Sequence, residues 1–250
     1  MTEHVIVNDA GGIRTIRMNR PDKRNALTLA MYEAMTVALE SANANDAVRC
    51  VLIVGVPGAF SAGNDLADFL NAAQSSGGLN RPALRFLPAL VRCGKPLVAA
   101  VSGVAVGIGT TMLLHCDFVV AGTDARFSTP FVSLGLVPEA ASSLLAPLLM
   151  GHRRAFEFLV MGHPLNATHA KDFGIANMVV APQDVDAEAL KAAREIAALP
   201  PGAVALSRGL MRGATDELLA RIDQEAKIFS ECLHSPEAKA AFEAFFARKR

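Results

Sequence analysis

The chain has no excess of charge of either sign. Its 250 residues include 24 lysines and arginines against 24 aspartates and glutamates, so the formal net charge at pH 7 is zero. A neutral chain has no overall field to attract nucleic acid or an anionic membrane surface. We therefore expect neither nucleic acid nor a membrane as a partner.

Cysteine is scarce, and its positions are far apart. Zinc sites and redox dithiols use closely spaced pairs, whereas the four cysteines are Cys50, Cys93, Cys116 and Cys232. The histidines at 115, 152, 163 and 169 show no paired ligand spacing either. We expect structural thiols in a reducing compartment and no bound metal.

The first residues lack the basic and apolar regions of a secretory signal, which favours a cytoplasmic location. One stretch, 96–116, has no acidic or basic side chain other than His115 and is long enough for a membrane span. Gly103, Gly107 and Gly109 interrupt it, which favours a buried strand, a glycine turn and a helix instead.

Hydrophobic patterns predict an α/β protein. Strands are expected at 4–7, 13–18, 50–54, 96–101, 117–121 and 175–180, with helices capped by Thr28, over 81–92, and near Thr111, Ala155 and Ala170. This alternation is typical of an α/β core. From Asp186 onward three helical patterns follow, the last capped by Ser235.

Two apolar faces on the C-terminal helices are expected to pack on a neighbouring subunit, with packing inside the chain as the alternative. They consist of Ala205, Leu206, Leu210 and Met211, and of Phe242, Phe245 and Phe246.

Two glycine turns, 60–66 and 102–109, each follow a strand-like run and lead toward a helix-like one. Such turns direct backbone N–H groups from distant parts of a chain at one oxygen atom. Glu139 follows thirty residues after Gly109, among apolar neighbours. An oxyanion hole with a general base indicates an enzyme that handles an enolate.

The stretches 18–27, 60–66, 95–103 and 116–117 together resemble the crotonase (enoyl-CoA hydratase/isomerase) superfamily over essentially the whole chain. The resemblance implies a spiral of repeated β-β-α units over 1–195 with the acyl-CoA site, and a helical trimerisation region over 196–250. Residues 61–66 and 128–139 resemble the peroxisomal-type Δ3,Δ2-enoyl-CoA isomerases most closely.

The resemblance also implies roles for particular residues. Glu139 would be the single acid/base, and the N–H groups of Asn64 and Ile108 would bind the thioester oxygen. The two glutamates of hydratases correspond to Thr111 and Phe131, neither of which carries a carboxyl group. Moving a double bond needs only one base. Burial among apolar side chains is expected to raise the pKa of Glu139 toward neutrality.

Further residues are implied as contacts of the substrate and its coenzyme A portion. These are Lys23, Arg24, Ala26, Ala62, Gly63, Asp65, Leu66, Gly107, Thr111 and Phe131. A solvated basic turn is the alternative for Lys23 and Arg24. Coenzyme A belongs to the substrate, so no separate cofactor is expected.

The expected reaction is the shift of a 3-enoyl-CoA double bond to trans-2-enoyl-CoA. The alternatives are an enoyl-CoA hydratase, an acyl-CoA thioester hydrolase and a catalytically inactive acyl-CoA-binding protein. The resemblance further implies a homotrimer or a hexamer made of two trimers.

Overall fold

The computed structural model describes residues 2–65 and 81–247. Its larger sheet has six strands in the order β1-β2-β3-β5-β7-β10. Only β1 and β2 are antiparallel, and the other neighbours in this sheet are parallel. The strands are β1 (Val5–Ala10), β2 (Ile13–Met18), β3 (Cys50–Val54), β5 (Leu97–Val101), β7 (Phe118–Gly122) and β10 (Met178–Val180).

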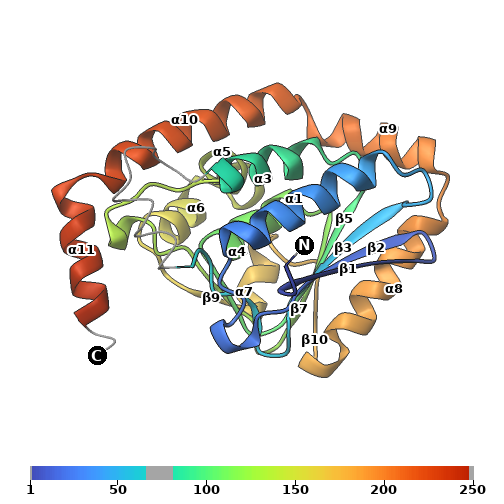
Figure 1. The fold of residues 1–250 in the computed structure, drawn as a ribbon, viewed down its shortest axis with the longest axis horizontal. Coiled ribbons are helices and arrows are strands. Elements are labelled where there is room, and N and C mark those ends of the chain that lie inside the picture. The colour runs from blue at the N-terminus through green and yellow to red at the C-terminus, as the bar shows by residue number, and fades with distance from the viewer. Residues whose placement is uncertain (1, 66–80, 248–250) are drawn as a thin grey trace.

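Helices cover both faces of this sheet. On one face α1 (Leu29–Asn43) and α3 (Arg81–Arg92) lie side by side, and α8 (Val185–Ala198) covers the other (Figure 1). Alternate residues of β3 therefore join different apolar clusters, Val51 and Ile53 with α1, and Leu52 with α8. Burial on both sides explains the uninterrupted apolar sequence of this strand.

A second sheet contains β4 (Ala59–Ser61), β6 (Val104–Val106), β8 (Arg126–Ser128) and β9 (Leu165–Asn166). The pairs β4/β6 and β6/β8 are parallel, and β8/β9 is antiparallel. Helices α4 (Ile108–Thr111), α5 (Ser142–Met150), α6 (His152–Leu159) and α7 (Ala167–Asp172) complete this half. The α/β class is thus confirmed.

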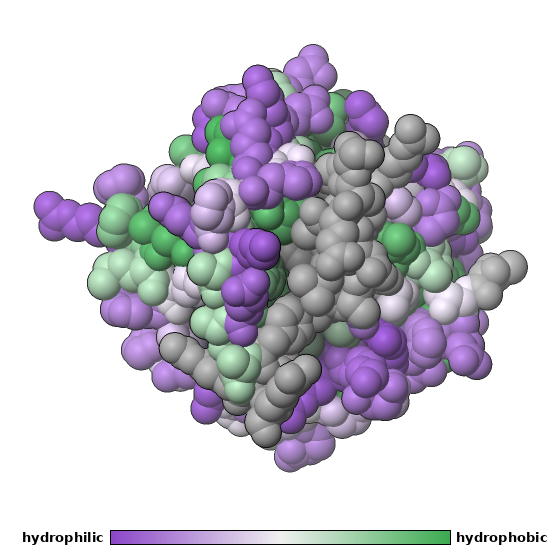
Figure 2. Space-filling model, turned by 60° about the vertical axis from the view of Figure 1, so that its left-hand side comes forward, coloured by the Kyte–Doolittle hydropathy of each residue, from purple (hydrophilic) through white to green (hydrophobic). Residues whose placement is uncertain are grey.

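The last helices are α9 (Pro201–Arg212), α10 (Thr215–Leu233) and α11 (Pro236–Ala247), which lie along the outside of the molecule (Figure 1). Counting α8, the described residues 185–247 form four helices rather than the three predicted, because Pro200 and Pro201 separate α8 from α9. The boundary predicted at 195/196 falls inside α8. Figure 2 shows apolar (green) and polar (purple) side chains mixed on the face toward α11.

Both predicted hydroxyl caps are confirmed. The hydroxyl oxygen of Thr28 accepts the N–H of Met31 at 3.3 Å, and that of Ser235 accepts the N–H of Ala238 at 3.1 Å.

All four cysteines are free thiols. Within 2–65 and 81–247, no helix is both long and apolar enough to cross a membrane, and no cluster of three or more His, Cys, Asp or Glu side chains could hold a metal ion.

Candidate active site

The two glycine turns leave the carboxyl ends of adjacent parallel strands, β4 and β6. They approach so closely that a side chain would not fit between them. A Cβ atom at Gly63 would lie 2.8 Å from the carbonyl oxygen of Val106, and one at Gly109 would lie 2.7 Å from that of Ser61. The glycines therefore allow two segments that are distant in sequence to meet at one place.

Each turn presents a backbone N–H group. Leu27 donates its N–H to Gly63 at 2.7 Å and accepts that of Asp65 at 2.9 Å, so the N–H of Asn64, between them, points away from Leu27. Ile108 is the first residue of α4, and its N–H therefore lacks an acceptor within that helix. Neither N–H has an acceptor among the described residues.

Glu139 lies over the first turn of α4. Thr111 Oγ1 is 3.2 Å from Glu139 Oε1 and 3.3 Å from the carbonyl oxygen of Gly107, so its one proton can serve either acceptor. The structure thus brings three predicted site residues together beside Ile108, although 28 residues separate Thr111 from Glu139.

The environment of Glu139 favours its protonated form. The residue is only 9% exposed. Burial raises the pKa of Glu139 to about 7, the hydrogen bond from Thr111 opposes this rise, and the negative charge of Glu225 adds to it. The predicted direction is confirmed, and a carboxyl group with this pKa can both accept and return a proton near neutral pH.

Phe131 contributes an apolar wall. Its Cε1 atom would be 4.0 Å from a Cβ atom at Gly107, and the residue is 6% exposed. It belongs to an apolar cluster with Phe229 and Leu233 of α10 and Phe242 of α11. The expectation that Phe242 packs on a neighbouring subunit is therefore wrong, because α11 folds back on its own chain. The side chains of Phe245 and Phe246 lie outside the described part of the structure.

Tyr32 of α1 is a site residue that the sequence analysis missed. Its hydroxyl group donates a hydrogen bond of 2.6 Å to Asn64 Oδ1. Burial and the negative charge of Glu139 raise the pKa of Tyr32, so its hydroxyl stays neutral. The neutral hydroxyl of Tyr32 thus holds the side chain of Asn64 from α1.

The segment before α1 is fastened to the first glycine turn. Arg20 Nη1 lies 2.6 Å from Asp65 Oδ2 and donates to the carbonyl oxygen of Ala26 at 2.9 Å. The N–H of Ala62 donates to the carbonyl oxygen of Arg24 at 2.8 Å. Arg20, which the sequence analysis did not single out, therefore holds two predicted coenzyme A contacts, Ala26 and Asp65.

Two further predicted contacts, Lys23 and Arg24, are exposed at the end of a short 3-10 helix (Pro21–Lys23). Their roles toward coenzyme A stay predictions, and Leu66 lies outside the described residues.

Comparisons with known proteins identify the family of this chain. The family model "Enoyl-CoA hydratase/isomerase" matches residues 8–250. Enoyl-CoA delta isomerase 2 of Rattus norvegicus is 37% identical over 88% of this chain, which spans 57% of the length of that relative. The 4-chlorobenzoyl coenzyme A dehalogenase-2 of Arthrobacter is 32% identical over 86% of this chain and 80% of its own.

A solved structure, Pseudomonas aeruginosa OdaA, is 45% identical with a TM-score of 0.92, covering 98% of this chain and 99% of its own. The fold is therefore the crotonase fold predicted from the sequence. The relatives carry the names of different reactions on coenzyme A thioesters, so they identify the family and leave the reaction open. The chain belongs to the enoyl-CoA hydratase/isomerase family.

Proposed function

We propose that this protein is a Δ3,Δ2-enoyl-CoA isomerase with Glu139 as its single acid/base. The observation that carries the proposal is the pairing of one carboxyl group, Glu139, with a hydroxyl, Thr111, where a hydratase of the resembling family has a second carboxyl. Phe131 stands at the other hydratase position and is buried. One proton acceptor beside two free N–H groups is what a double-bond shift requires.

The carboxylate of Glu139 removes a proton from C2 of the 3-enoyl thioester. The electron pair moves into the thioester carbonyl, giving a dienolate whose oxygen accepts the N–H groups of Asn64 and Ile108. Each such donor is worth about 3 kcal/mol in the transition state. The protonated Glu139 then delivers the same proton to C4, and the double bond ends between C2 and C3. Proton count and charge balance without metal or added cofactor.

Hydration is a weaker candidate for this site. Adding water across a double bond requires one group to activate the water and another to protonate C2. The hydroxyl of Thr111 is too weak an acid to protonate C2 near neutral pH, and Phe131 would exclude water. Thioester hydrolysis also needs a single base and an oxyanion hole. The site geometry therefore fits hydrolysis as well as isomerisation, and an activity assay must distinguish the two reactions.

The test offers purified protein trans-3-hexenoyl-CoA and, separately, crotonyl-CoA, and follows the conjugated enoyl thioester in the ultraviolet. We expect absorbance to appear with the first substrate and to persist with the second. Loss of the crotonyl signal would indicate hydration. Free coenzyme A, measured with a thiol reagent, would indicate hydrolysis, and no reaction with either substrate would favour an acyl-CoA-binding protein.

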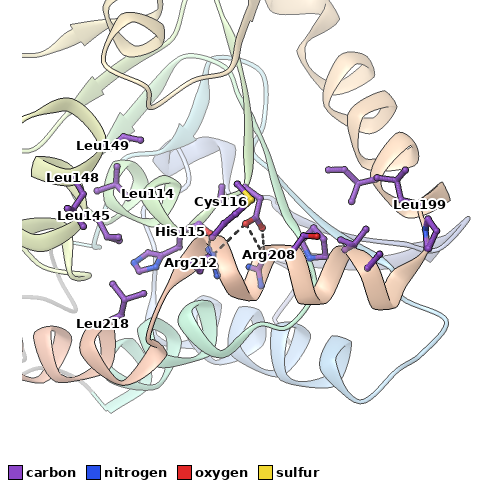
Figure 3. A pocket seen from close by; sticks show the side chains of 18 residues that line it. Leu114, His115, Cys116, Leu145, Leu148, Leu149, Leu199, Arg208, Arg212 and Leu218 are labelled. Atoms are coloured by element: carbon purple, nitrogen blue, oxygen red, sulfur yellow. Dashed lines mark hydrogen bonds and ion pairs between the residues drawn. The ribbon is translucent and has the colours of Figure 1, made fainter.

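We also propose that the protein is a homotrimer, alone or as two stacked trimers, with α9 at the contact between copies. Leu206, Leu210 and Met211 of α9 are 73%, 87% and 87% exposed. Beside them a groove of about 790 Å³ runs between α9 and α5, with Leu148 at its apolar end and Arg208 and Arg212 directed inward from α9 (Figure 3). This groove does not include Glu139.

Sedimentation equilibrium tests the assembly. The mass should be three or six times 26.3 kDa, and Leu210→Glu should reduce it, because a charge would be buried at the contact. A monomeric wild-type protein at micromolar concentration would contradict the proposal.

A further inference from the structure

The turn that follows Glu139 has an unfavourable backbone conformation. Ala140 and Ala141 have φ angles of 62° and 54°, in the left-handed region. Residues with a Cβ atom avoid this region, and two in succession are uncommon. The turn therefore needs contacts from elsewhere in the chain to hold it.

Those contacts come from two distant elements. Glu225 of α10 accepts the N–H of Ala141 at 2.6 Å with one carboxylate oxygen. With the other it accepts the N–H of Ser143 at 3.0 Å and its hydroxyl at 2.5 Å. On the other side of the turn, His115 Nε2 donates to the carbonyl oxygen of Ala140 at 2.7 Å.

Glu225 also caps helix α5. This helix starts at Ser142, and its own N-cap residue, Ala141, has no side chain that can accept a hydrogen bond. The first N–H groups of a helix need such acceptors. The carboxylate of Glu225, 5% exposed, supplies one from another helix. Three hydrogen bonds converge on this side chain from a single turn.

We propose that Glu225 is a positioning residue of the active site, which fixes the turn carrying Glu139 and places a second negative charge behind it. This inference rests on the proposed role of Glu139. Glu225 need not touch the substrate. The helical region after residue 200 would thus take a direct part in preparing the acid/base, in addition to forming a wall of the site.

The charged and titratable groups around this pair are few among the described residues. Burial raises the pKa of Glu225, while its hydrogen bonds to Ser143 and Ala141 and the charge of Arg221 lower it. Arg221 itself donates to Ser143 Oγ at 3.1 Å.

Two more titratable groups face Glu139 and its turn. His115 is neutral, because burial lowers its pKa to about 4, and Tyr32 is neutral for the reason given above. Burial is the main cause of the raised pKa of Glu139, and the negative charge of Glu225 adds to it.

The experiment compares Glu225→Gln with Glu231→Gln, an exposed glutamate on the same helix. Isomerisation of trans-3-hexenoyl-CoA is measured from pH 5 to 9, and circular dichroism checks folding. For Glu225→Gln we expect kcat to fall about thirtyfold at unchanged KM, because an amide cannot accept all three hydrogen bonds. The acidic limb of kcat/KM should move about half a pH unit lower, because a negative charge is lost.

Wild-type kcat and an unmoved acidic limb in folded Glu225→Gln would overturn the inference, as would an equal effect of Glu231→Gln. If Glu225→Gln does not fold, the Ser143→Ala variant tests the inference instead. It removes one hydrogen bond and keeps the carboxylate, so kcat should fall about fivefold at unchanged KM, and wild-type kcat would overturn the inference. The isomerase proposal itself is tested separately by comparing the isomerisation rates of wild-type protein and Glu139→Gln. Equal rates, or no isomerisation by either protein, would contradict that proposal rather than the role of Glu225.

Discussion

The two walls of the candidate site are made from different chemical groups. One wall offers backbone N–H groups, from Asn64 and Ile108, and sheet pairing between β4 and β6 sets its geometry. The other offers a single side chain, Glu139, on a turn that depends on distant contacts. The first wall should therefore tolerate changes of side chain and fail when the backbone moves, while the second should fail when one functional group is lost.

The largest effect should come from the side-chain wall. Glu139→Gln keeps the size of the residue and removes its basicity, so we expect kcat for trans-3-hexenoyl-CoA to fall about a thousandfold. The exposed Glu231→Gln serves as the matched control and should keep wild-type kcat. Wild-type activity in folded Glu139→Gln would remove the base from the mechanism.

The same substitution should change stability in a pH-dependent way. The pKa of Glu139 is raised from 4.5 to about 7, so between these values the folded protein holds a proton that the unfolded chain releases. The free energy of unfolding therefore falls as pH rises through this window, by roughly 3 kcal/mol from this group. Because glutamine does not titrate, the Glu139→Gln variant should not lose this stability as pH rises.

Urea unfolding of both proteins at pH 5 and pH 8 measures it. The free energy of unfolding of Glu139→Gln, relative to that of wild type, should be higher at pH 8 than at pH 5. The buried neutral His115, with its pKa lowered to about 4, destabilises both proteins as pH falls from about 6.5, and its contribution cancels in the comparison. A difference that does not change with pH would contradict the burial of an ionisable Glu139.

The backbone wall should break when the turns are forced apart. Gly109→Ala places a Cβ atom 2.7 Å from the carbonyl oxygen of Ser61 and should displace the N–H of Ile108, lowering kcat about a hundredfold. Gly202→Ala in α9 is the control, since its Cβ atom meets nothing within 4 Å. Equal kcat in the two folded variants would show that this close approach does not matter for the reaction.

A smaller effect on activity is expected from Thr111, whose hydroxyl contacts Glu139. The hydrogen bond from Thr111 lowers the pKa of Glu139, so Thr111→Val should raise that pKa and move the acidic limb of kcat/KM to higher pH. Activity at pH 6 should fall about fivefold, with little change at pH 9. A limb that stays in place or moves to lower pH would contradict the contact between these residues.

The smallest effect should come from the side chain of Ile108. Its N–H is the proposed functional group, so Ile108→Val should keep kcat within about twofold, even though the buried substitution lowers stability by about 1 kcal/mol. Steady-state kinetics of the folded variant checks this. A tenfold loss of kcat would show that the side chain itself takes part.

Local sequence patterns predicted the parts of the fold that are long and continuously apolar. The expected strands 13–18 and 50–54 and the helix 81–92 have the observed bounds. The second sheet was missed, because strands of three residues such as β4 and β6 are too short to show a period. The glycine turns that these strands carry were nevertheless visible, since their conformation requires a particular residue type.

The candidate site divides in the same way. Glu139 was found through its apolar neighbours and its position after a glycine turn. Glu225 was not, because α10 contains three glutamates, at 217, 225 and 231, and only the tertiary structure shows that this one is buried against a turn 84 residues away. Tyr32 likewise looks like one more apolar position of α1 until its hydroxyl meets Asn64.

The pairing of β4 with β6 has a consequence for protein engineering. Since main-chain hydrogen bonds set where both donors point, the part of the site suited to a negatively charged oxygen does not depend on which side chains surround it. The side chains at positions 111, 131 and 139, among which we propose Glu139 as the acid/base, could then be exchanged without rebuilding that part. A designer seeking a new reaction on a thioester enolate could keep the two backbone N–H donors and change only the side chains around them.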